Sequence, residues 1–353
     1  MKTKRNQAEF ILKGNQLKYW RFSQYLVALL GVALWIALLI TPEIGLHAFW
    51  NVLIPIAPAL VVFASGLWRN ICPMASTSLL PRHLGFSQKK RVSKKLSEKF
   101  HLYSILILLL VIPFRHVILD SSGLSTAILL FILASLAFYL GYRYDWKSGW
   151  CSGVCPISSV EKLYGRKSVF RLANAHCKYC INCVVPCPDS TPQTQPMRKK
   201  KKSAMILLGG FPGFIWGWFQ IPDYYNNDGW GNLISIYSLP FISMFVSLMI
   251  FYFIKKILHE KHHELLINIF TFAAVSLYYW FRIPALVGFG KFPQDGRLID
   301  LSQSIPESVP FYIKITLIII FFGWFFLKKE NEISWLVRPP FVIKKSKLKL
   351  SNS

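Results

Sequence analysis

The sequence predicts an all-α integral membrane protein of about eight transmembrane helices, with a cysteine-rich segment in the cytoplasm. Of its 353 residues, 53% are hydrophobic and 16% are charged, yet 41 Lys and Arg face only 16 Asp and Glu. The apolar residues gather in long runs, while the cations gather in the connections, which is typical of membrane proteins. A basic nucleic-acid-binding protein carries more charge, and a disordered chain carries fewer large apolar residues, so both classes are excluded.

Eight apolar runs are long enough to cross a ~30 Å hydrocarbon core as helices. In order along the chain, they cover residues 24–41, 48–67, 102–119, 125–143, 204–221, 235–254, 266–288 and 308–327. Pro55 and Pro58 lie in the second run, where a membrane helix tolerates them. The fifth run has the weakest pattern, because Gly209, Gly210, Pro212, Gly213 and Gly217 interrupt it. The first run lies far from the start and lacks a cleavage site, so we expect it to remain as a helix.

The distribution of cations predicts the orientation. Alternate connections and the two tails hold 36 of the 41 Lys and Arg. Since cytoplasmic loops retain positive charge, we expect a bacterial inner-membrane protein with both termini and all seven cysteines in the cytoplasm. The RKKKK run at 198–202 then serves topology rather than nucleic-acid binding.

This orientation predicts a simple domain organisation. A basic tail (1–23) precedes two helical hairpins (24–143), a cytoplasmic segment (144–203), four further spans (204–327) and a second basic tail (328–353).

The cytoplasmic segment carries the strongest chemical signal in the chain. Cys177, Cys180, Cys183 and Cys187, followed by Pro188, have the spacing C-x2-C-x2-C-x3-C-P of bacterial ferredoxins. Three thiolates three residues apart can surround one face of a [4Fe-4S] cluster, and the fourth can reach a different cluster. The fold class is therefore a helical membrane protein with a ferredoxin-like [4Fe-4S] insert.

A shorter motif occurs twice upstream. Cys151, Cys155 and Pro156 form C-x3-C-P, which matches the last two cysteines of the ferredoxin run. The segment WRNICPMASTSLL (68–80) aligns without gaps with CSGVCPISSVEKL (151–163), pairing Cys72 with Cys155 and Trp68 with Cys151. Each copy follows a helical hairpin, which indicates a duplicated unit whose first copy is degenerate.

Other interpretations of the cysteines are less favourable. A reducing cytoplasm disfavours disulfides. Zinc sites usually pair C-x2-C motifs at a distance, so three successive x2 gaps and a C-P favour iron and sulfur. For Cys72 alone, a small packed residue near a helix end remains an equal alternative.

The hairpins leading into C-x3-C-P motifs, followed by a ferredoxin run, resemble polyferredoxin-like membrane iron-sulfur proteins of the NapH/NosR type. These are quinol-dehydrogenase membrane components linked to periplasmic nitrate and nitrous oxide reduction. The resemblance covers roughly residues 24–190 and implies a quinol donor and a respiratory reductase system as beneficiary. This chain differs in having Trp68 in the first motif and a single ferredoxin run.

The number of thiolates limits the clusters. Two [4Fe-4S] clusters need eight thiolates, and the chain has seven. By analogy with two-cluster ferredoxins, we assign Cys177, Cys180, Cys183 and Cys155 to cluster one. The remaining thiolates, Cys187, Cys151 and Cys72, suit a [3Fe-4S] cluster or a second [4Fe-4S] cluster whose fourth ligand is Asp145, Ser148 or His176.

Ionisable residues in the apolar runs are further candidates. Arg115 and His116 could contact a quinone headgroup, but their place near the outer end of the third run favours side chains that extend to the interface. We expect the same of Arg282 and Lys314. Haem is disfavoured because facing histidine pairs are missing, and HEKHHE (259–264) is expected to be a solvated loop rather than a metal site.

The sequence thus indicates membrane-bound electron transfer, as a component of a quinol-linked oxidoreductase, with the quinone pool and a redox partner protein as partners. Two alternatives stay open. The chain could donate electrons for maturation of a metallo-oxidoreductase, or it could be a membrane iron or redox sensor.

Overall fold

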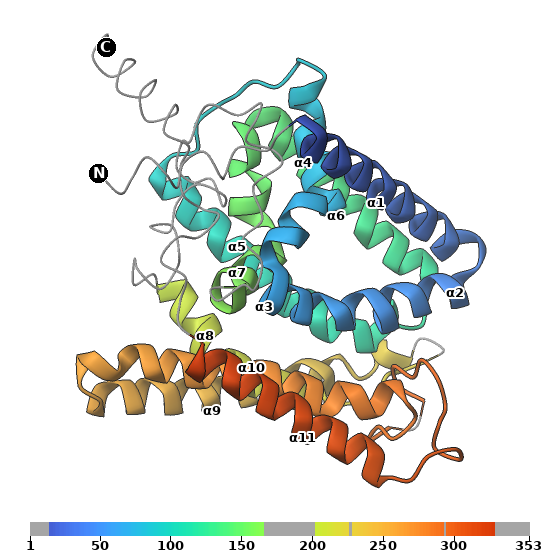
Figure 1. The fold of residues 1–353 in the computed structure, drawn as a ribbon, viewed down its shortest axis with the longest axis vertical. Coiled ribbons are helices and arrows are strands. Elements are labelled where there is room, and N and C mark those ends of the chain that lie inside the picture. The colour runs from blue at the N-terminus through green and yellow to red at the C-terminus, as the bar shows by residue number, and fades with distance from the viewer. Residues whose placement is uncertain (1–13, 166–201, 226–227, 293, 329–353) are drawn as a thin grey trace.

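The structure is a computed structural model that describes residues 14–165, 202–225, 228–292 and 294–328 (Figure 1). Every regular element in these ranges is helical, and the one β-type pairing within them is a bridge between Lys90 and Tyr144. The predicted all-α class is confirmed. The ferredoxin run and most of the predicted insert lie outside the described residues.

The N-terminal half contains seven α-helices joined by short π- and 3-10-helical turns. In chain order they are α1 (Gly14–Ile40), α2 (Pro42–Leu46), η1 (His47–Leu53), α3 (Ile54–Ile71), α4 (Pro73–His83), α5 (Lys94–Phe114), η2 (Arg115–Leu119), α6 (Gly123–Arg143), η3 (Trp146–Ser148), η4 (Trp150–Val154) and α7 (Pro156–Tyr164). The C-terminal half contains α8 (Lys202–Trp218), η7 (Asp228–Trp230), α9 (Leu233–Ile257), η8 (Glu260–His262), α10 (His263–Leu286), α11 (Ser308–Phe322) and η9 (Gly323–Leu327). In Figure 1, α9, α10 and α11 form one layer along the lower edge.

Seven helical segments of the described chain are long and apolar enough to cross a membrane. They are Asn15–Ile40, Pro42–Ala64, Lys95–Leu119, Gly123–Arg143, Leu233–Ile257, Glu260–Leu286 and Ser308–Leu327. Each overlaps a predicted run. The first begins at Asn15, upstream of residue 24, where its predicted run starts. These segments indicate a multi-pass membrane protein that contacts the lipid bilayer along its length.

The fifth predicted span, at 204–221, corresponds to α8, a helix of 17 residues that falls short of the length of the other seven. At 1.5 Å per residue it is about 25 Å long. Tyr164 at the end of α7 contacts Phe211 in the middle of α8, and Trp218 Nε1 at the end of α8 donates to Ile112 O late in α5 at 3.0 Å. The last turn of α8 therefore lies beside the last turn of α5.

The glycines that interrupt the apolar run of α8 are its packing face. A Cβ atom on Gly209 would lie 2.8 Å from the Phe251 ring, and one on Gly213 would lie 2.6 Å from the Ser243 carbonyl carbon. Gly217 faces Pro240 and Leu239 of the same helix. The spacing of four residues places all three on one side, so α8 and α9 approach closely as an antiparallel pair.

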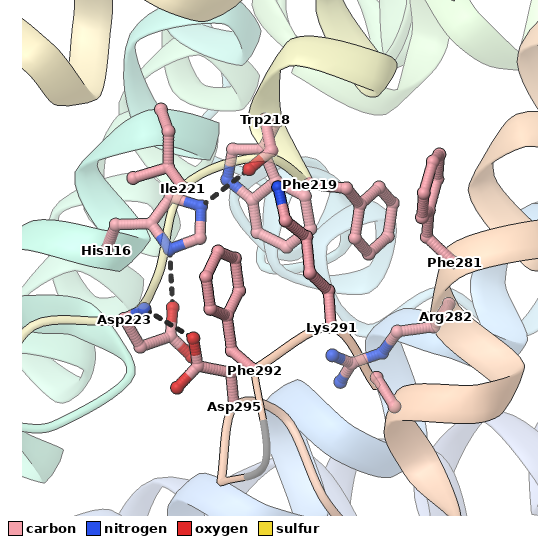
Figure 2. Close-up of a pocket in the computed structure, with 11 residues that line it drawn as sticks. His116, Trp218, Phe219, Ile221, Asp223, Phe281, Arg282, Lys291, Phe292 and Asp295 are labelled. Carbon is pink, nitrogen blue, oxygen red and sulfur yellow. Dashed lines mark hydrogen bonds and ion pairs between the residues drawn. The ribbon is translucent and has the colours of Figure 1, made fainter. Parts of the chain in front are cut away.

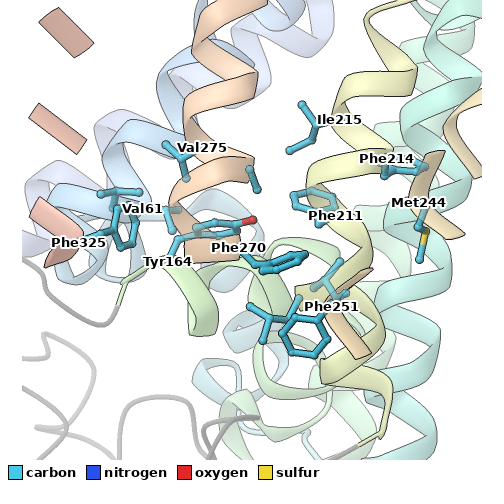
Figure 3. Packing of buried hydrophobic residues seen from close by; sticks show 14 of the residues in the cluster. Val61, Tyr164, Phe211, Phe214, Ile215, Met244, Phe251, Phe270, Val275 and Phe325 are labelled. Carbon is cyan, nitrogen blue, oxygen red and sulfur yellow. The ribbon is translucent and has the colours of Figure 1, made fainter. Parts of the chain in front are cut away.

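The largest apolar cluster joins the two halves of the chain. It takes Val61 and Val62 from α3, Phe211 from α8, Phe251 from α9 and Phe321 from α11 (Figure 3). Because helices from both halves contribute, the halves form one packed body rather than two separate bundles.

A tyrosine repairs the proline-containing segment of α3. Tyr279 of α10 donates its hydroxyl to Pro55 O at 2.8 Å and accepts from Ala59 N at 2.8 Å. Pro55 O and Ala59 N would otherwise bond to each other across one helical turn. The hydroxyl is thus inserted into the backbone ladder beside Pro58 and satisfies both groups in an apolar surrounding.

Candidate metal centre and distal pocket

The two Cys-Pro motifs have the same local structure. Cys72 ends α3 and precedes α4, with Pro73 at the first helical position, and its φ and ψ are −54° and 121°. Cys155 follows η4 and precedes α7, with Pro156 in the same place, and its φ and ψ are −56° and 120°. Proline suits the first helical position because its missing N–H would be unpaired there. The sequence repeat is therefore a structural repeat.

Ion pairs and hydrogen bonds hold the two motifs together. Arg69, three residues before Cys72, pairs with Glu161 of α7, and Lys147 Nζ donates to Arg69 O at 3.5 Å. Met74, Cys151 and Cys155 pack on one apolar cluster that contains Trp150 and Val154. Helices α3, α4 and α7 therefore meet at the cysteines.

Helix α5 fixes the second motif from the other side. Ser104 Oγ donates to Cys155 O at 2.7 Å and lies 2.9 Å from Ser159 Oγ, which in turn lies 3.1 Å from His101 Nδ1. Ser104 and Ser159 are fully buried. The start of α7, and with it the Cys155 side chain, is thus held against α5.

The two thiols have similar electrostatic surroundings. Burial raises the pKa of Cys72. Burial, followed by the charge of Cys72, raises the pKa of Cys155 to about 12. Backbone N–H groups of the helix that follows each cysteine oppose these shifts, those of Ala75 and Met74 at Cys72 and those of Ser158 and Ile157 at Cys155.

The described thiols fit an iron-sulfur site but do not complete one. Cys72, Cys151 and Cys155 form no disulfide in the part of the chain that the structure describes, and cysteine thiolates are the usual ligands of such clusters. No three potential metal ligands converge within the described ranges. Cys177, Cys180, Cys183, Cys187 and His176, which would supply the rest, lie outside the described residues.

The oxygen ligands considered from the sequence have other partners. Asp145 forms an ion pair with Arg82 of α4, and Ser148 Oγ donates to Asp145 O. Both residues are buried. Their contacts fasten η3 to α4, which gives them a structural role beside the cysteines.

At the end of α5 remote from the cysteines, here called the distal end, the structure corrects one prediction. Arg115 and His116 are 5% and 3% exposed, so neither side chain extends to an interface. Arg115 donates from Nε and Nη2 to the two carboxylate oxygens of Asp120, at 3.1 and 3.0 Å. Its guanidinium lies 4.3 Å from the Trp50 ring centre and 5.0 Å from that of Trp218. The prediction was wrong because paired charges and ring faces replace the missing water.

His116 is held on both ring nitrogens. Nδ1 lies 2.5 Å from Asp223 Oδ1, Nε2 lies 3.1 Å from Trp218 O, and the ring stacks on that of Trp218 at 4.7 Å. A carboxylate and a carbonyl are both acceptors, so the two bonds form together only when both nitrogens carry protons. Burial alone would raise the pKa of Asp223, but the hydrogen bond and the charge of His116 leave it below its usual value.

A pocket opens beside His116, with about 420 Å³ of empty space, part of it continuous with solvent. We call it the distal pocket (Figure 2). It is lined by His116, Trp218, Phe219, Ile221, Asp223, Phe281, Arg282, Ala285, Lys291, Phe292 and Asp295. Six of the eleven lining residues are apolar, four of them aromatic, and the other five are ionisable, so apolar walls and converging polar groups are both present, as in small-molecule sites.

Two polar groups of the distal pocket were not singled out from the sequence. Asp295 Oδ2 accepts from Asp223 N at 2.6 Å, and burial together with the charge of Asp223 raises the pKa of Asp295 to about 6. Both acids stand in cation-poor connections between apolar runs, which was the available signal. In isolation, however, such acids are ordinary loop residues.

The other cationic candidates differ in their surroundings. Arg282 is 3% exposed and donates from Nη2 to Trp50 O and Asn51 Oδ1, each at 2.8 Å, so its expected extension to the interface is wrong. Lys314 Nζ lies 4.3 Å from the Trp280 ring centre. In HEKHHE, His259 accepts from Lys261 N as the cap of η8, and His263 and Glu264 begin α10, so most of the segment predicted to be a loop is helical.

Comparison with known proteins yields one local match. Over 63 residues the chain is 32% identical to the ferredoxin-type protein NapH of Haemophilus influenzae, a match that covers 17% of this chain and 22% of that protein. No protein-family model matches the chain. No solved structure matches it. The match supports a polyferredoxin-like relationship over that stretch.

Proposed function

We propose that the chain is a membrane-bound iron-sulfur protein that passes electrons between the quinone pool and a respiratory reductase system. The observation that carries this proposal is the ferredoxin spacing at 177–187. It is combined with two structurally equivalent Cys-Pro motifs, which lie upstream in the sequence and contact each other in the fold. The local similarity to a ferredoxin-type protein supports the same reading. The quinol donor and the partner reductase are proposed from the resemblance of the cysteine motifs to NapH/NosR-type proteins.

The cofactor we propose is one [4Fe-4S] cluster, with a second [4Fe-4S] or [3Fe-4S] cluster as a further expectation. Such clusters accept and release single electrons and carry net negative charge. Cys177, Cys180 and Cys183 would supply three ligands, and the Cys-Pro motifs would supply others. The described residues contribute N–H groups at each sulfur and the buried ammonium of Lys147, which is 2% exposed.

The orientation remains part of the proposal. Cation placement puts the cysteines in the cytoplasm of a bacterial cell, which would put the distal pocket toward the outer face. Ser104, which holds the second motif, and His116 lie twelve residues apart on one helical rod. At 1.5 Å per residue this is about 18 Å, so a molecule in the distal pocket would not touch the cysteines.

For the quinone, His116 is the better of the two contacts considered from the sequence. It lines the distal pocket, whereas Arg115 packs on the Trp218 ring and is held by Asp120. A quinol oxidised there must release protons, and the pocket holds two carboxylates, Asp223 and Asp295, to receive them. The separation from the cysteines then requires a further electron carrier or a quinone that moves between the two ends.

Anaerobic purification followed by electron paramagnetic resonance tests the proposal. Dithionite should produce an iron-sulfur signal in the wild type, and a quinol analogue should reduce the same centre. Cys180→Ser should abolish the signal. His116→Asn should retain the dithionite signal and lose about a hundredfold or more in the rate of reduction by quinol, the lower end of the effect expected of one group that takes part in proton transfer.

Two results would contradict these assignments separately. A wild-type protein supplied with iron and sulfide that shows no iron-sulfur signal would remove the proposed function. A His116→Asn variant with an unchanged rate of reduction by quinol would leave the cluster in place but remove the distal pocket as the quinol site.

A further inference from the structure

We infer that Cys72 and Cys155 are ligands of one and the same cluster, bound between the N-termini of α4 and α7. This inference rests on the proposed function and revises the assignment that placed Cys72 and Cys155 in different clusters. It also assigns Cys72, the cysteine of the degenerate motif, as a ligand. From the sequence alone, a small packed residue was an equal alternative.

The first argument is the equivalence of the two positions. The backbone angles of Cys72 and Cys155 differ by no more than 2°, and both residues precede a proline that starts a helix. Helices α4 and α7 have 11 and 9 residues, long enough for their N-terminal amides to act together. A cysteine that only fills space has no need to share its backbone conformation with another cysteine. Two ligands of one cluster, in contrast, must direct their sulfurs toward the same place.

The second argument is that separate contacts bring the motifs together. The Arg69–Glu161 ion pair spans from just before Cys72 to the middle of α7, and the Lys147–Arg69 hydrogen bond joins the segment before Cys151 to α3. Met74 and Cys155 share one apolar cluster.

The third argument is the balance of charge. Two thiolates and a cluster bring negative charge into a half-buried place, and such charge needs compensation. Each cysteine directly precedes a helix N-terminus, where unpaired N–H groups carry partial positive charge, and the buried Lys147 ammonium donates to Arg69 O, three residues before Cys72. Glu161, which opposes a negative group, is paired with Arg69. The surroundings thus favour an anion shared between the two sulfurs.

Iron content measured in a double-variant cycle tests the inference. We expect Cys72→Ser and Cys155→Ser each to lose one cluster, about four irons per chain, and the double variant to lose no more than either single variant. Acid-labile sulfide should fall in parallel. If the losses add, the two cysteines serve different clusters and the inference is wrong.

A measurement without iron separates this inference from the proposed function and from misfolding. A full-length variant that keeps Cys72 and Cys155 and replaces the other five cysteines with Ser is treated with dibromobimane, which becomes fluorescent when it bridges two nearby thiols. We expect bridging within one chain, and none in matched variants that keep Cys72 alone or Cys155 alone. Absence of bridging would overturn the inference, even if the wild type contains iron.

Discussion

Replacing Asp120 with Asn should show that the distal charges are part of the packed interior. Asp120 accepts both hydrogen bonds of Arg115, and the two side chains are 11% and 6% exposed. The substitution keeps the shape and one acceptor but removes the negative charge. Arg115 is then a buried cation without its paired carboxylate, next to the amide oxygen and the faces of Trp50 and Trp218.

The structure sets the size of the effect. Breaking a buried ion pair by removing one partner costs about 3–5 kcal/mol, because the other charge is left uncompensated. The retained amide oxygen and the two indole rings offset part of this, so we expect a loss of about 3 kcal/mol. Burying both charges costs free energy that their attraction only partly regains, so the pair itself adds little net stability. Arg115→Met combined with Asp120→Asn should therefore lose less than Asp120→Asn alone.

A second Arg–Asp pair provides the control. Arg297 and Asp300 form an ion pair whose side chains are 38% and 44% exposed. An exposed pair contributes about 0–1 kcal/mol, so Asp300→Asn should have little effect. The free energy of unfolding of each variant can be measured by titrating the protein with SDS in mixed micelles, with tryptophan fluorescence as the signal.

Equal losses for Asp120→Asn and Asp300→Asn would refute the reasoning. That result would mean that the Arg115 guanidinium reaches water or lipid headgroups, as the sequence alone suggested, and that the indole faces do not enclose it.

Two further predictions concern the same unfolding measurement. Gly213→Ala places a Cβ atom 2.6 Å from the Ser243 carbonyl carbon and should lower the free energy of unfolding by about 1–3 kcal/mol. Gly31→Ala, whose nearest neighbour is Pro73 Cβ at 3.7 Å, should not lower it. Equal stability of the two variants would mean that α8 does not pack through its glycines. Burial raises the pKa of Asp295 to about 6, so its contribution is present below about pH 4 and is lost as pH rises through 6. Asp295→Asn should therefore gain about 1 kcal/mol on the wild type between pH 5 and 7.5, after allowance for partial exposure, and parallel pH profiles would contradict this.

The sequence predicted the helices well because each long apolar run has few other options in a membrane. It also predicted the Cys-Pro repeat, since Cys72 and Cys155 carry a spacing that local geometry reproduces. For α8, the glycines that weakened the apolar pattern are the residues that let α9 approach. A glycine interrupts an apolar run in the sequence, whereas in the packed structure its missing side chain lets another helix approach.

The distal pocket could not be predicted from the sequence, for a different reason. Position along the apolar run suggested that Arg115 and His116 reach an interface, but their partners Asp120 and Asp223 come from a turn and from a distant loop. Whether a cation in a membrane segment extends outward or is paired inside depends on which loop folds over it. That information lies in long-range contacts, which a single sequence does not display.

The hydroxyl of Tyr279 has a consequence for biogenesis. Until α10 enters the membrane, the proline-containing turn of α3 has a carbonyl and an N–H without their final partner. An early translation product ending before α10 therefore contains a helix with two backbone groups that lack their final partner, and such groups are costly in lipid. The last third of the chain, although remote from every cysteine in sequence, thereby completes the helix that leads into Cys72.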